Sequence, residues 1–439
     1  MNQIFTPKKI VEELDKYIIS QDEAKKNVAV SLRNRYRRKN VKDKNLSNEI
    51  TPKNIILMGP TGVGKTEIAR RLAKVNNSPF IKVEATKFTE IGYVGKDVES
   101  MIKDLVNSTY TLIKNEKIEL FKEDVLPEVF ETVLKALRPY EINDNDKENL
   151  ILKIINGDFD NEKIKIEKEL KNPNGPIIEV FAGGGEDDIQ GAIENLMGGF
   201  PGMKKSKEAE MTVIDAIDYL TRQKVEKKIE NEDLSREVIK RVEEDGIIFI
   251  DEIDKIAERS SNGRSDVSRQ GVQRDILPIV EGTTVITKYG PCQTDHILFI
   301  AAGAFSMASP SDLMPELQGR FPVRVKLNSL NKNDFIKILT DVEYNLLEQY
   351  KAMLLVDNVN LEFTKGAIEK IADVAMDLNE NQENIGARRL HTVIEKILNE
   401  IMFEAPFDEK KEIKIGKKDI DKFYSIANKK ENLDNYILW

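Results

Sequence analysis

The sequence predicts an α/β protein with three parts: a parallel β-sheet covered by helices on both faces, a helical insertion within that domain, and a small, mainly helical C-terminal domain. Short, β-branched apolar runs recur between helical segments, as they do in sheets that are buried on both faces. The stretch between about residues 107 and 238 is instead polar and helically periodic, and the sheet pattern resumes after it. Beyond Leu327 the chain is helical again.

The N-terminus carries two helix-start signals. Thr6 followed by Pro7 offers a cap and a proline at the first helical position. Residues 20–23 have the S-x-x-E form of a capping box, which predicts a second helix. We interpret the basic run in that helix as a solvated end whose cations suit the helix dipole. The run contains Arg33, Arg35, Arg37, Arg38 and Lys39.

Four apolar runs predict the strands of the sheet, at 54–58, 80–84, 246–250 and 297–301. A glycine-rich turn follows the first strand, and a helix is expected over 65–74. Val125, Val129, Val133 and Leu137 keep helical spacing within the insertion, whereas the glycine-rich segments 182–188 and 197–202 are typical of loops. A short strand is expected at 413–415 in the C-terminal part.

These elements divide the chain into three domains, one of them discontinuous. Residues 1–107 and 239–328 form the α/β domain, and 108–238 form the inserted helical domain. Residues 329–439 form the C-terminal domain and its tail. A chain of 439 residues is expected to hold about two to four domains, which agrees with this division.

Composition excludes several classes of protein. Cys292 is the single cysteine, so a disulfide framework and cysteine-based zinc modules are excluded, and two histidines cannot build a His-rich metal site. The 76 acidic residues outnumber 67 basic ones, which argues against a binder of duplex nucleic acid. The apolar runs are too short to span a membrane and no signal peptide is evident, so we expect a cytoplasmic protein.

The turn after the first strand fits the phosphate-binding pattern G-x-x-x-x-G-K-[ST] over residues 59–66. Its glycines allow backbone N–H groups to turn toward a β-phosphate. Lys65 would reach the β- and γ-phosphates, and the Thr66 hydroxyl would ligate Mg²⁺. The sequence therefore predicts a nucleoside triphosphate site.

A second apolar strand ends in Asp251 and Glu252. Asp251 at the carboxyl end can hold Mg²⁺ through water, and Glu252 can polarise the attacking water. An acidic pair at this place favours hydrolysis over a switch-type GTPase or a metabolite kinase.

Phosphoryl transfer also benefits from a cation on the developing charge, for which Arg320 and Arg388 are candidates. From the residues alone, an ordinary ion pair is the alternative for both. Gly92, Tyr93, Val94 and Gly95 could form a flexible loop with an apolar grip, or a turn with a tyrosine packed in the core.

Several segments resemble the HslU (ClpY) family, the AAA+ unfoldases that serve HslV peptidases. The resemblance covers both ends and the nucleotide-binding core and is looser in the insertion. It rests on residues 51–55, 59–74, 79–90, 92–95, 272–275, 315–320 and 385–391.

The resemblance implies an AAA+ fold, a hexameric ring, and ATP with Mg²⁺ between subunits. The residues implied for nucleotide binding are Ile19, Gly62, Val63, Gly64, Lys65, Thr66, Glu67, Asp251, Glu316 and Arg388. Catalysis would involve Lys65, Asp251, Glu252, Arg388 and, toward the neighbouring subunit, Arg320. Tyr93 would line the central pore. Peptidase docking would involve Tyr436, Ile437, Leu438 and Trp439.

Three positions depart from the family pattern. Ser20 stands where glycine is usual, and the capping box is a local substitute. Ala302 replaces an expected serine, which puts a hydroxyl contact at that strand end in question. Trp439 extends the apolar tail by one aromatic residue.

The resemblance implies an ATP-dependent unfoldase and translocase that feeds polypeptide to a separate threonine peptidase. We expect no peptidase site in this chain, because neither histidine lies near a Ser or Cys in a recognisable nucleophile motif. Two enzymatic alternatives remain: a ClpX-like unfoldase for a serine peptidase, disfavoured by the single cysteine and the long insertion, and an AAA+ DNA motor, supported only by the basic run. A non-enzymatic, chaperone-like ring is a further alternative.

Overall fold

A computed structural model describes residues 6–88, 96–138, 144–169, 206–230, 232–257, 265–422 and 424. The chain separates into two compact units, of which the second interrupts the first in sequence. Unit 1 comprises Met1–Leu112 and Leu234–Trp439, and unit 2 comprises Ile113–Asp233. The finer domain limits that the sequence suggests stay a prediction.

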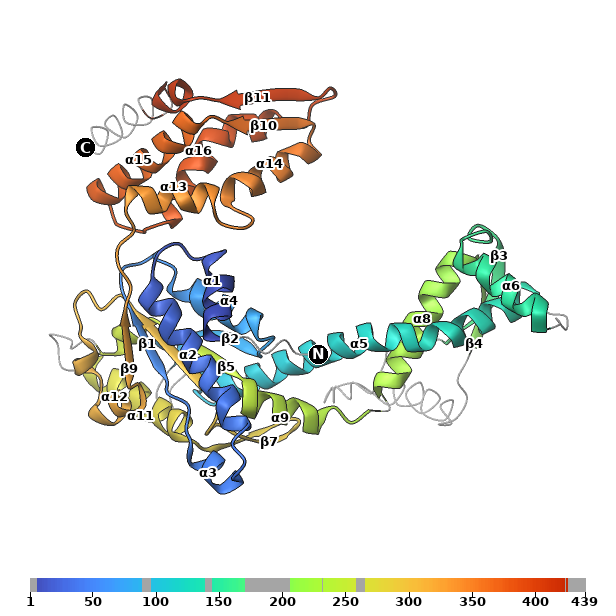
Figure 1. Cartoon of the computed structure of the whole chain (residues 1–439), viewed down its shortest axis with the longest axis horizontal. Helices are drawn as coiled ribbons and strands as arrows, with labels where there is room; N and C mark the ends of the chain where they lie inside the picture. The colour runs from blue at the N-terminus through green and yellow to red at the C-terminus, as the bar shows by residue number, and fades with distance from the viewer. Residues whose placement is uncertain are drawn as a thin grey trace, which may run out of the picture. The chain divides into compact units, whose positions relative to one another are not determined.

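Unit 1 is built on a five-stranded parallel sheet with the strand order β2-β5-β8-β1-β9 (Figure 1). Phe80 pairs with Ile247, and Ile55 pairs with both Ile300 and Val323. The parallel sheet confirms the predicted fold class, while β9 was not predicted. The strands are β1 (Ile55–Met58), β2 (Phe80–Glu84), β5 (Ile247–Asp251), β8 (Leu298–Gly303) and β9 (Val323–Lys326).

One face of this sheet packs on the N-terminal helices α1 (Pro7–Asp15) and α2 (Asp22–Lys39) and on α4 (Lys65–Val75). Strand side chains alternate between faces, so Ile55 and Leu57 of β1 enter this core together. Both are fully buried, as are their partners Ile300 and Ala302 on β8. The core therefore anchors the strand and the helix that flank the phosphate loop.

The start of α1 agrees with the sequence, but the start of α2 does not. Thr6 caps α1 through the backbone N–H of Lys9. The predicted capping box at 20–23 is wrong, because α2 begins at Asp22 and its cap residue Gln21 makes no side-chain capping bond. Ser20 and Gln21 both have left-handed backbone, with φ of 57° and 63°.

Further elements of unit 1 surround the sheet. The helix α5 (Ser100–Leu137) begins in unit 1, and an antiparallel hairpin of β6 (Thr284–Thr287) and β7 (Gly290–Gln293) precedes β8. The hairpin was not predicted. The remaining helices are α3 (Lys44–Glu49), η1 (Ala85–Lys87), α9 (Ser235–Asp245), α10 (Ile253–Ala257), α11 (Ser265–Glu281), η2 (Pro310–Asp312) and α12 (Pro315–Arg320).

The C-terminal part of unit 1 has a second apolar core. Two parallel strands, β10 (Val359–Phe363) and β11 (Lys411–Ile415), accompany helices in this core. The strand expected at 413–415 is β11, whereas its partner β10 was not predicted. The helices are α13 (Lys332–Thr340), α14 (Leu346–Val356), α15 (Lys365–Asn381) and α16 (Arg388–Glu404).

Unit 2 is mainly helical. Val125, Val129 and Val133 of α5 are buried, as their helical spacing predicts. The sequence did not predict its two-stranded antiparallel sheet of β3 (Lys163–Glu169) and β4 (Ser206–Thr212). The other helices among its described residues are α6 (Asp144–Ile155) and α8 (Val213–Glu230). The loops expected at 182–188 and 197–202 lie outside the described residues.

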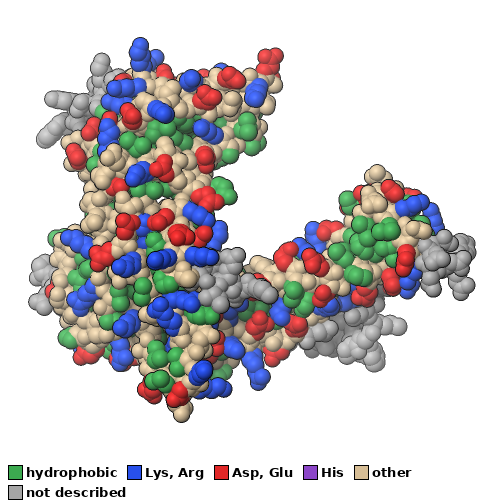
Figure 2. Space-filling view, viewed as in Figure 1, with side chains coloured by type: hydrophobic (Ala, Val, Ile, Leu, Met, Phe, Trp, Pro, Cys, Tyr) green, Lys and Arg blue, Asp and Glu red, His purple; other side chains and the backbone are tan. Residues whose placement is uncertain are grey.

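Charged side chains of both signs are interspersed over the face seen in Figure 2. In the described part of the chain, no helix combines the length and apolar character needed to cross a membrane.

Candidate functional site

A cavity of about 560 Å³ opens at the carboxyl ends of β1, β5 and β8, where segments from both cores of unit 1 meet. Parallel strands place their carboxyl ends at one edge of a sheet, and ligands of such folds bind there. The predicted residues that line this cavity are Ile19, Gly62, Val63, Gly64, Lys65, Thr66, Glu67, Asp251, Glu252 and Arg388.

The phosphate loop has the backbone that its glycines permit. Gly62 and Gly64 have φ of 73° and 102°, in the region that favours glycine, and α4 begins directly afterward at Lys65. The Lys65 ammonium donates to the loop carbonyls of Gly59 and Pro60, at 2.6 and 2.7 Å. Burial lowers the pKa of Lys65, an effect that Asp251 and Asp254 oppose. The loop therefore offers N–H donors and a cation at one end of the cavity.

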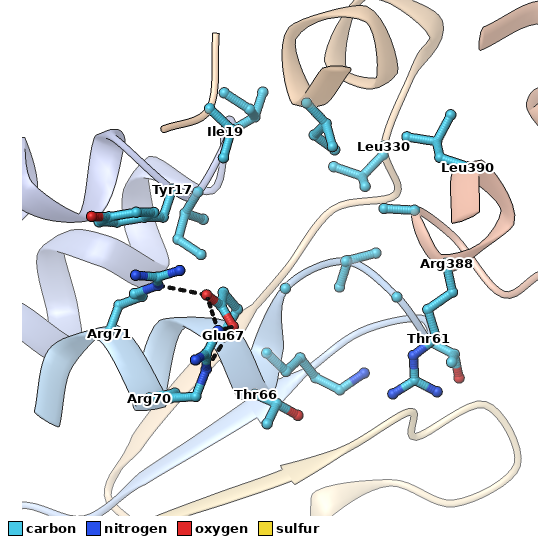
Figure 3. Close-up of a pocket in the computed structure, with 18 of the residues that line it drawn as sticks. Tyr17, Ile19, Thr61, Thr66, Glu67, Arg70, Arg71, Leu330, Arg388 and Leu390 are labelled. Carbon is cyan, nitrogen blue, oxygen red and sulfur yellow. Dashed lines mark hydrogen bonds and ion pairs between the residues drawn. The ribbon is translucent and has the colours of Figure 1, made fainter. Parts of the chain in front are cut away.

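A close backbone contact joins the phosphate loop to the segment before α16. The N–H of Ala387 donates to the Gly62 carbonyl at 3.0 Å. A Cβ on Gly62 would lie 2.0 Å from the Ile385 carbonyl oxygen, so only glycine allows this approach. Because α16 begins at the next residue, Arg388 extends toward the loop and ends beside Thr61 (Figure 3).

Asp251 and Glu252 lie at the end of β5. Asp251 forms an ion pair with Lys82 of the neighbouring strand at 2.7 Å. Glu252 has a φ of 56°, is exposed, and accepts a hydrogen bond from the Thr86 hydroxyl at 3.3 Å. The chain leaves the buried strand β5 at Glu252, through this left-handed turn. The Glu252 carboxylate is therefore accessible to water at the cavity.

Asp254, which the sequence analysis missed, is a further acidic group of this cavity. It is 2% exposed and accepts a hydrogen bond from the N–H of Phe305 at 3.1 Å. Its carboxylate fits against Gly303, where a Cβ would approach within 2.7 Å. Its place in the first turn of α10, three residues after Asp251, was the signal available in the sequence.

The opposite end of the cavity is more apolar and is also lined by Tyr17, Ile18 and Ile19 from the segment between α1 and α2. The guanidinium of Arg71 stacks 3.5 Å from the centre of the Tyr17 ring (Figure 3). Of this segment, the sequence singled out Ile19 alone. An apolar wall with one stacked ring suits a flat heterocycle such as a nucleobase.

Glu67 pairs with two arginines of its own helix, and all three residues line the cavity. It accepts hydrogen bonds from Arg70 and from Arg71, at distances down to 2.7 and 2.6 Å (Figure 3). Burial raises the pKa of Glu67, but these two hydrogen bonds outweigh it and the net shift is downward. Glu67 therefore stays ionised and holds the stacked Arg71 in place.

The donor set fits a nucleoside triphosphate with Mg²⁺. Thr66 and Asp251 both line the cavity. No cluster of three His, Cys, Asp or Glu side chains that could hold a metal ion occurs among the described residues. Mg²⁺ usually binds through one or two protein groups together with substrate phosphates and water, and Thr66 and Asp251 are the two groups of this cavity that could hold it.

Other predicted residues lie elsewhere. Glu316 and Arg320 of α12 do not line the cavity, and Arg320 forms an ion pair with Glu281 at 2.9 Å. Ala302 is fully buried in the apolar core of the sheet. Residues 92–95, with Tyr93, and the tail residues 436–439 lie outside the described residues.

Comparisons with known proteins agree with this geometry. Residues 55–122 match the ATPase family associated with various cellular activities (AAA), 181–324 match an AAA domain (Cdc48 subfamily), and 330–418 match the C-terminal, D2-small domain of ClpB protein. The chain is 47% identical to an ATP-dependent protease ATPase subunit HslU from Persephonella marina, over the whole of both chains. It is 45% identical to HslU from Listeria welshimeri, over all of this chain and 99% of that one. It is 46% identical over both full lengths to an ATP-dependent protease ATPase subunit ClpY from Bacillus velezensis. The chain therefore belongs to the HslU (ClpY) family of AAA+ ATPases.

Proposed function

We propose that this ATPase unfolds proteins and threads them into a separate HslV-type threonine peptidase, and that it has no peptidase activity of its own. The observation that carries the proposal is that one cavity is lined by the phosphate loop, by the acidic pair Asp251–Glu252 and by Arg388. The full-length relatives are named as ATPase subunits of ATP-dependent proteases, which suggests a peptidase partner for this chain as well.

ATP binding would begin at the phosphate loop. The Lys65 ammonium would exchange the carbonyls of Gly59 and Pro60 for phosphate oxygens, which are charged and therefore stronger acceptors. The N–H groups of residues 62–66 would complete the phosphate cradle, and Ile19 would contact the adenine. Mg²⁺, held by Thr66 and Asp251, would supply charge neutralisation at the phosphates.

Hydrolysis would use Glu252 as the general base. Its carboxylate is exposed at the cavity and anchored by the Thr86 hydroxyl, so it can orient a water for attack on the γ-phosphate. The guanidinium of Arg388, at the start of α16, lines the cavity and would stabilise the negative charge that develops on the γ-phosphate. Because Arg388 belongs to the C-terminal part, ATP binding and loss would change how that part contacts the phosphate loop.

Arg320 and Glu316 would act between subunits. They lie on α12, outside the lining of their own chain's cavity, and Arg320 is exposed in an ion pair with Glu281. In a ring of identical subunits, which we propose to be a hexamer, such an arginine can be offered to the ATP of a neighbour. Hydrolysis in one subunit would then depend on the position of the next.

The residues proposed for protein handling are the loop 92–95 and the tail 436–439. Tyr93 would grip an unfolded chain by stacking and steric contact, and the apolar tail would dock on the peptidase. Tyr93→Ala is expected to retain ATP hydrolysis and to lose degradation of a stably folded, tagged substrate in the presence of HslV. Degradation at the wild-type rate would refute the pore role of Tyr93.

A truncation that removes residues 432–439 tests the partner. Full-length protein should co-purify with an HslV-type peptidase in the presence of ATP, and the truncated protein should not. The truncated protein should still hydrolyse ATP without peptidase, which separates loss of docking from misfolding. Co-purification that survives the truncation would contradict the docking role of the tail.

A further inference from the structure

A second, smaller pocket of about 190 Å³ lies in unit 1 at the C-terminal end of α2, apart from the nucleotide cavity. Its lining is strongly basic and contains no acidic residue. The polar side chains that line it come from α2, from the segment before β1 and from the segment before β8. They are Ser31, Asn34, Arg35, Arg37, Arg38, Thr51, Lys53 and His296.

Two buried arginines of this pocket have different roles. Arg35, 5% exposed, donates to the carbonyls of Glu244, Asp245 and His296 at 2.7–3.2 Å, so it ties α2 to the neighbouring segments. Arg38 is 8% exposed, yet within the described ranges its guanidinium has no hydrogen bond or ion pair. The sequence-based interpretation of this run as a solvated helix end is therefore wrong for these two residues.

The acidic groups nearest to Arg38 are already engaged. Glu244 and Asp245 act on Arg38 only at longer range, and both form ion pairs with Lys39, at 3.2 and 2.8 Å. A guanidinium that is taken out of water without a close anion or acceptor is costly. Folding therefore removes the Arg38 guanidinium from water without giving it a close anionic partner.

His296 provides a second unsatisfied group. Its Nδ1 atom is buried and has no hydrogen-bond partner among the described residues. Burial and the charges of Arg38 and Arg35 lower the pKa of His296, while Asp295 and Glu244 act in the opposite direction. A positive potential and a buried, unsatisfied ring nitrogen thus occur among the residues that line one pocket.

We propose that this pocket is an oxyanion site, which takes a phosphate group or a carboxylate on Arg38 with help from Lys53. The planar guanidinium matches the geometry of either group and can form two parallel hydrogen bonds. Asn34, Ser31 and Thr51 add neutral donors around it. The anion is either free in solution, as inorganic phosphate, or an acidic side chain of a second copy of this chain.

The first test is calorimetric titration with sodium phosphate. All proteins carry Lys65→Ala, which removes the ammonium of the phosphate loop as a competing phosphate ligand. For a free anion, Arg38→Gln should weaken phosphate binding at least tenfold and Lys53→Gln about threefold. Lys26→Gln is the matched control, because Lys26 is exposed on the same helix and does not line the pocket. Its affinity should equal that of the parent protein.

The second test distinguishes the source of the anion. If phosphate does not bind, the full-length protein at micromolar concentration is examined by light scattering after size exclusion. A carboxylate from a second copy predicts that Arg38→Gln lowers the assembly mass and that Lys26→Gln does not. The proposal is overturned if Arg38→Gln and Lys53→Gln behave like Lys26→Gln in both measurements. Lys53 lies on the exposed rim, so its variant should fold even where loss of Arg38 disturbs the core.

Discussion

Replacing Gly386 by alanine should disconnect Arg388 from the phosphate loop. Gly386 has a φ of 59°, a conformation that costs an alanine about 1–2 kcal/mol. The new Cβ would lie 2.5 Å from the Thr61 carbonyl oxygen and 2.8 Å from Gly62 backbone atoms, which cannot move as a side chain can. Such overpacking costs about 1–3 kcal/mol.

The adjacent hydrogen bond adds to this magnitude. If the segment shifts, the bond from Ala387 to Gly62 is lost, at about 0.5–1.5 kcal/mol. Retaining the contact therefore costs about 2–5 kcal/mol in strain, whereas giving it up moves Arg388 away from the cavity. Because the clash is with backbone atoms, we expect the segment to shift, and ATP hydrolysis by the Gly386→Ala variant should then fall by at least tenfold. In either case, urea unfolding should shift to lower denaturant.

Gly366→Ala is the matched control. Gly366 lies in α15, its φ is not in the left-handed region, and its Cβ would meet only Lys417, at an ordinary 3.7 Å. This variant should keep wild-type kcat and gain up to about 1 kcal/mol of stability through helix propensity. If Gly386→Ala matched Gly366→Ala in kcat and in urea midpoint, the proposed role of the close contact would be refuted.

Three further outcomes are expected. Glu252→Gln should lower kcat by about 10²–10⁴ while nucleotide affinity stays within about threefold, and a loss below tenfold in an ATPase assay would exclude a general-base role. Burial, with a smaller effect of Glu243, raises the pKa of Cys292 from 9.0 to about 12, so the folded thiol should resist a disulfide reagent at pH 8 until denaturant is added. Because the pKa of Cys292 is raised in the folded state, the contribution of this thiol to stability is intact below pH 9 and is lost as the pH rises toward 12. Between pH 8 and 10, the wild-type protein should therefore lose about 1 kcal/mol more stability than Cys292→Ala. Equal losses in the two proteins would contradict the raised pKa. Ser20→Ala removes the 2.6 Å hydrogen bond to Asp334 but keeps the left-handed backbone, so chemical unfolding should show a loss of about 1 kcal/mol, and no loss would mean that the bond is not stabilising.

The central strands could be predicted from the sequence because they are continuous apolar runs. The edge strand β9 could not, since it alternates: Val325 is buried while Arg324 and Lys326 are exposed. The other edge strand, β2, has three apolar residues among five and was predicted, whereas the four residues of β9 include only two apolar ones, which give too weak a pattern. β10 has the same difficulty, because it consists of five residues with a mixed burial pattern.

In the candidate site, features that depend on neighbouring residues could be predicted, and features that depend on contacts with distant residues could not. The phosphate loop carries its backbone requirements in adjacent glycines, so its position followed from the sequence. The predicted capping box failed because Ser20 bonds to Asp334 and Gln21 bonds to Asn328, both about 310 residues away in the chain. No local pattern contains those partners, and the same holds for the contact of Gly62 with Ala387.

The strand order also has a consequence for biosynthesis. β1 and β2 are made first, but they are not neighbours, since β5 and β8 lie between them in the sheet. After Glu84, about 160 residues must be added before β5 emerges, which at roughly 5–20 residues per second takes about 8–30 s. During that time two apolar strands have no partner and are open to intermolecular pairing. We therefore expect the nascent chain to depend on chaperone protection until β8 is complete. Unit 2 forms a compact unit of its own, so we expect it to fold before unit 1.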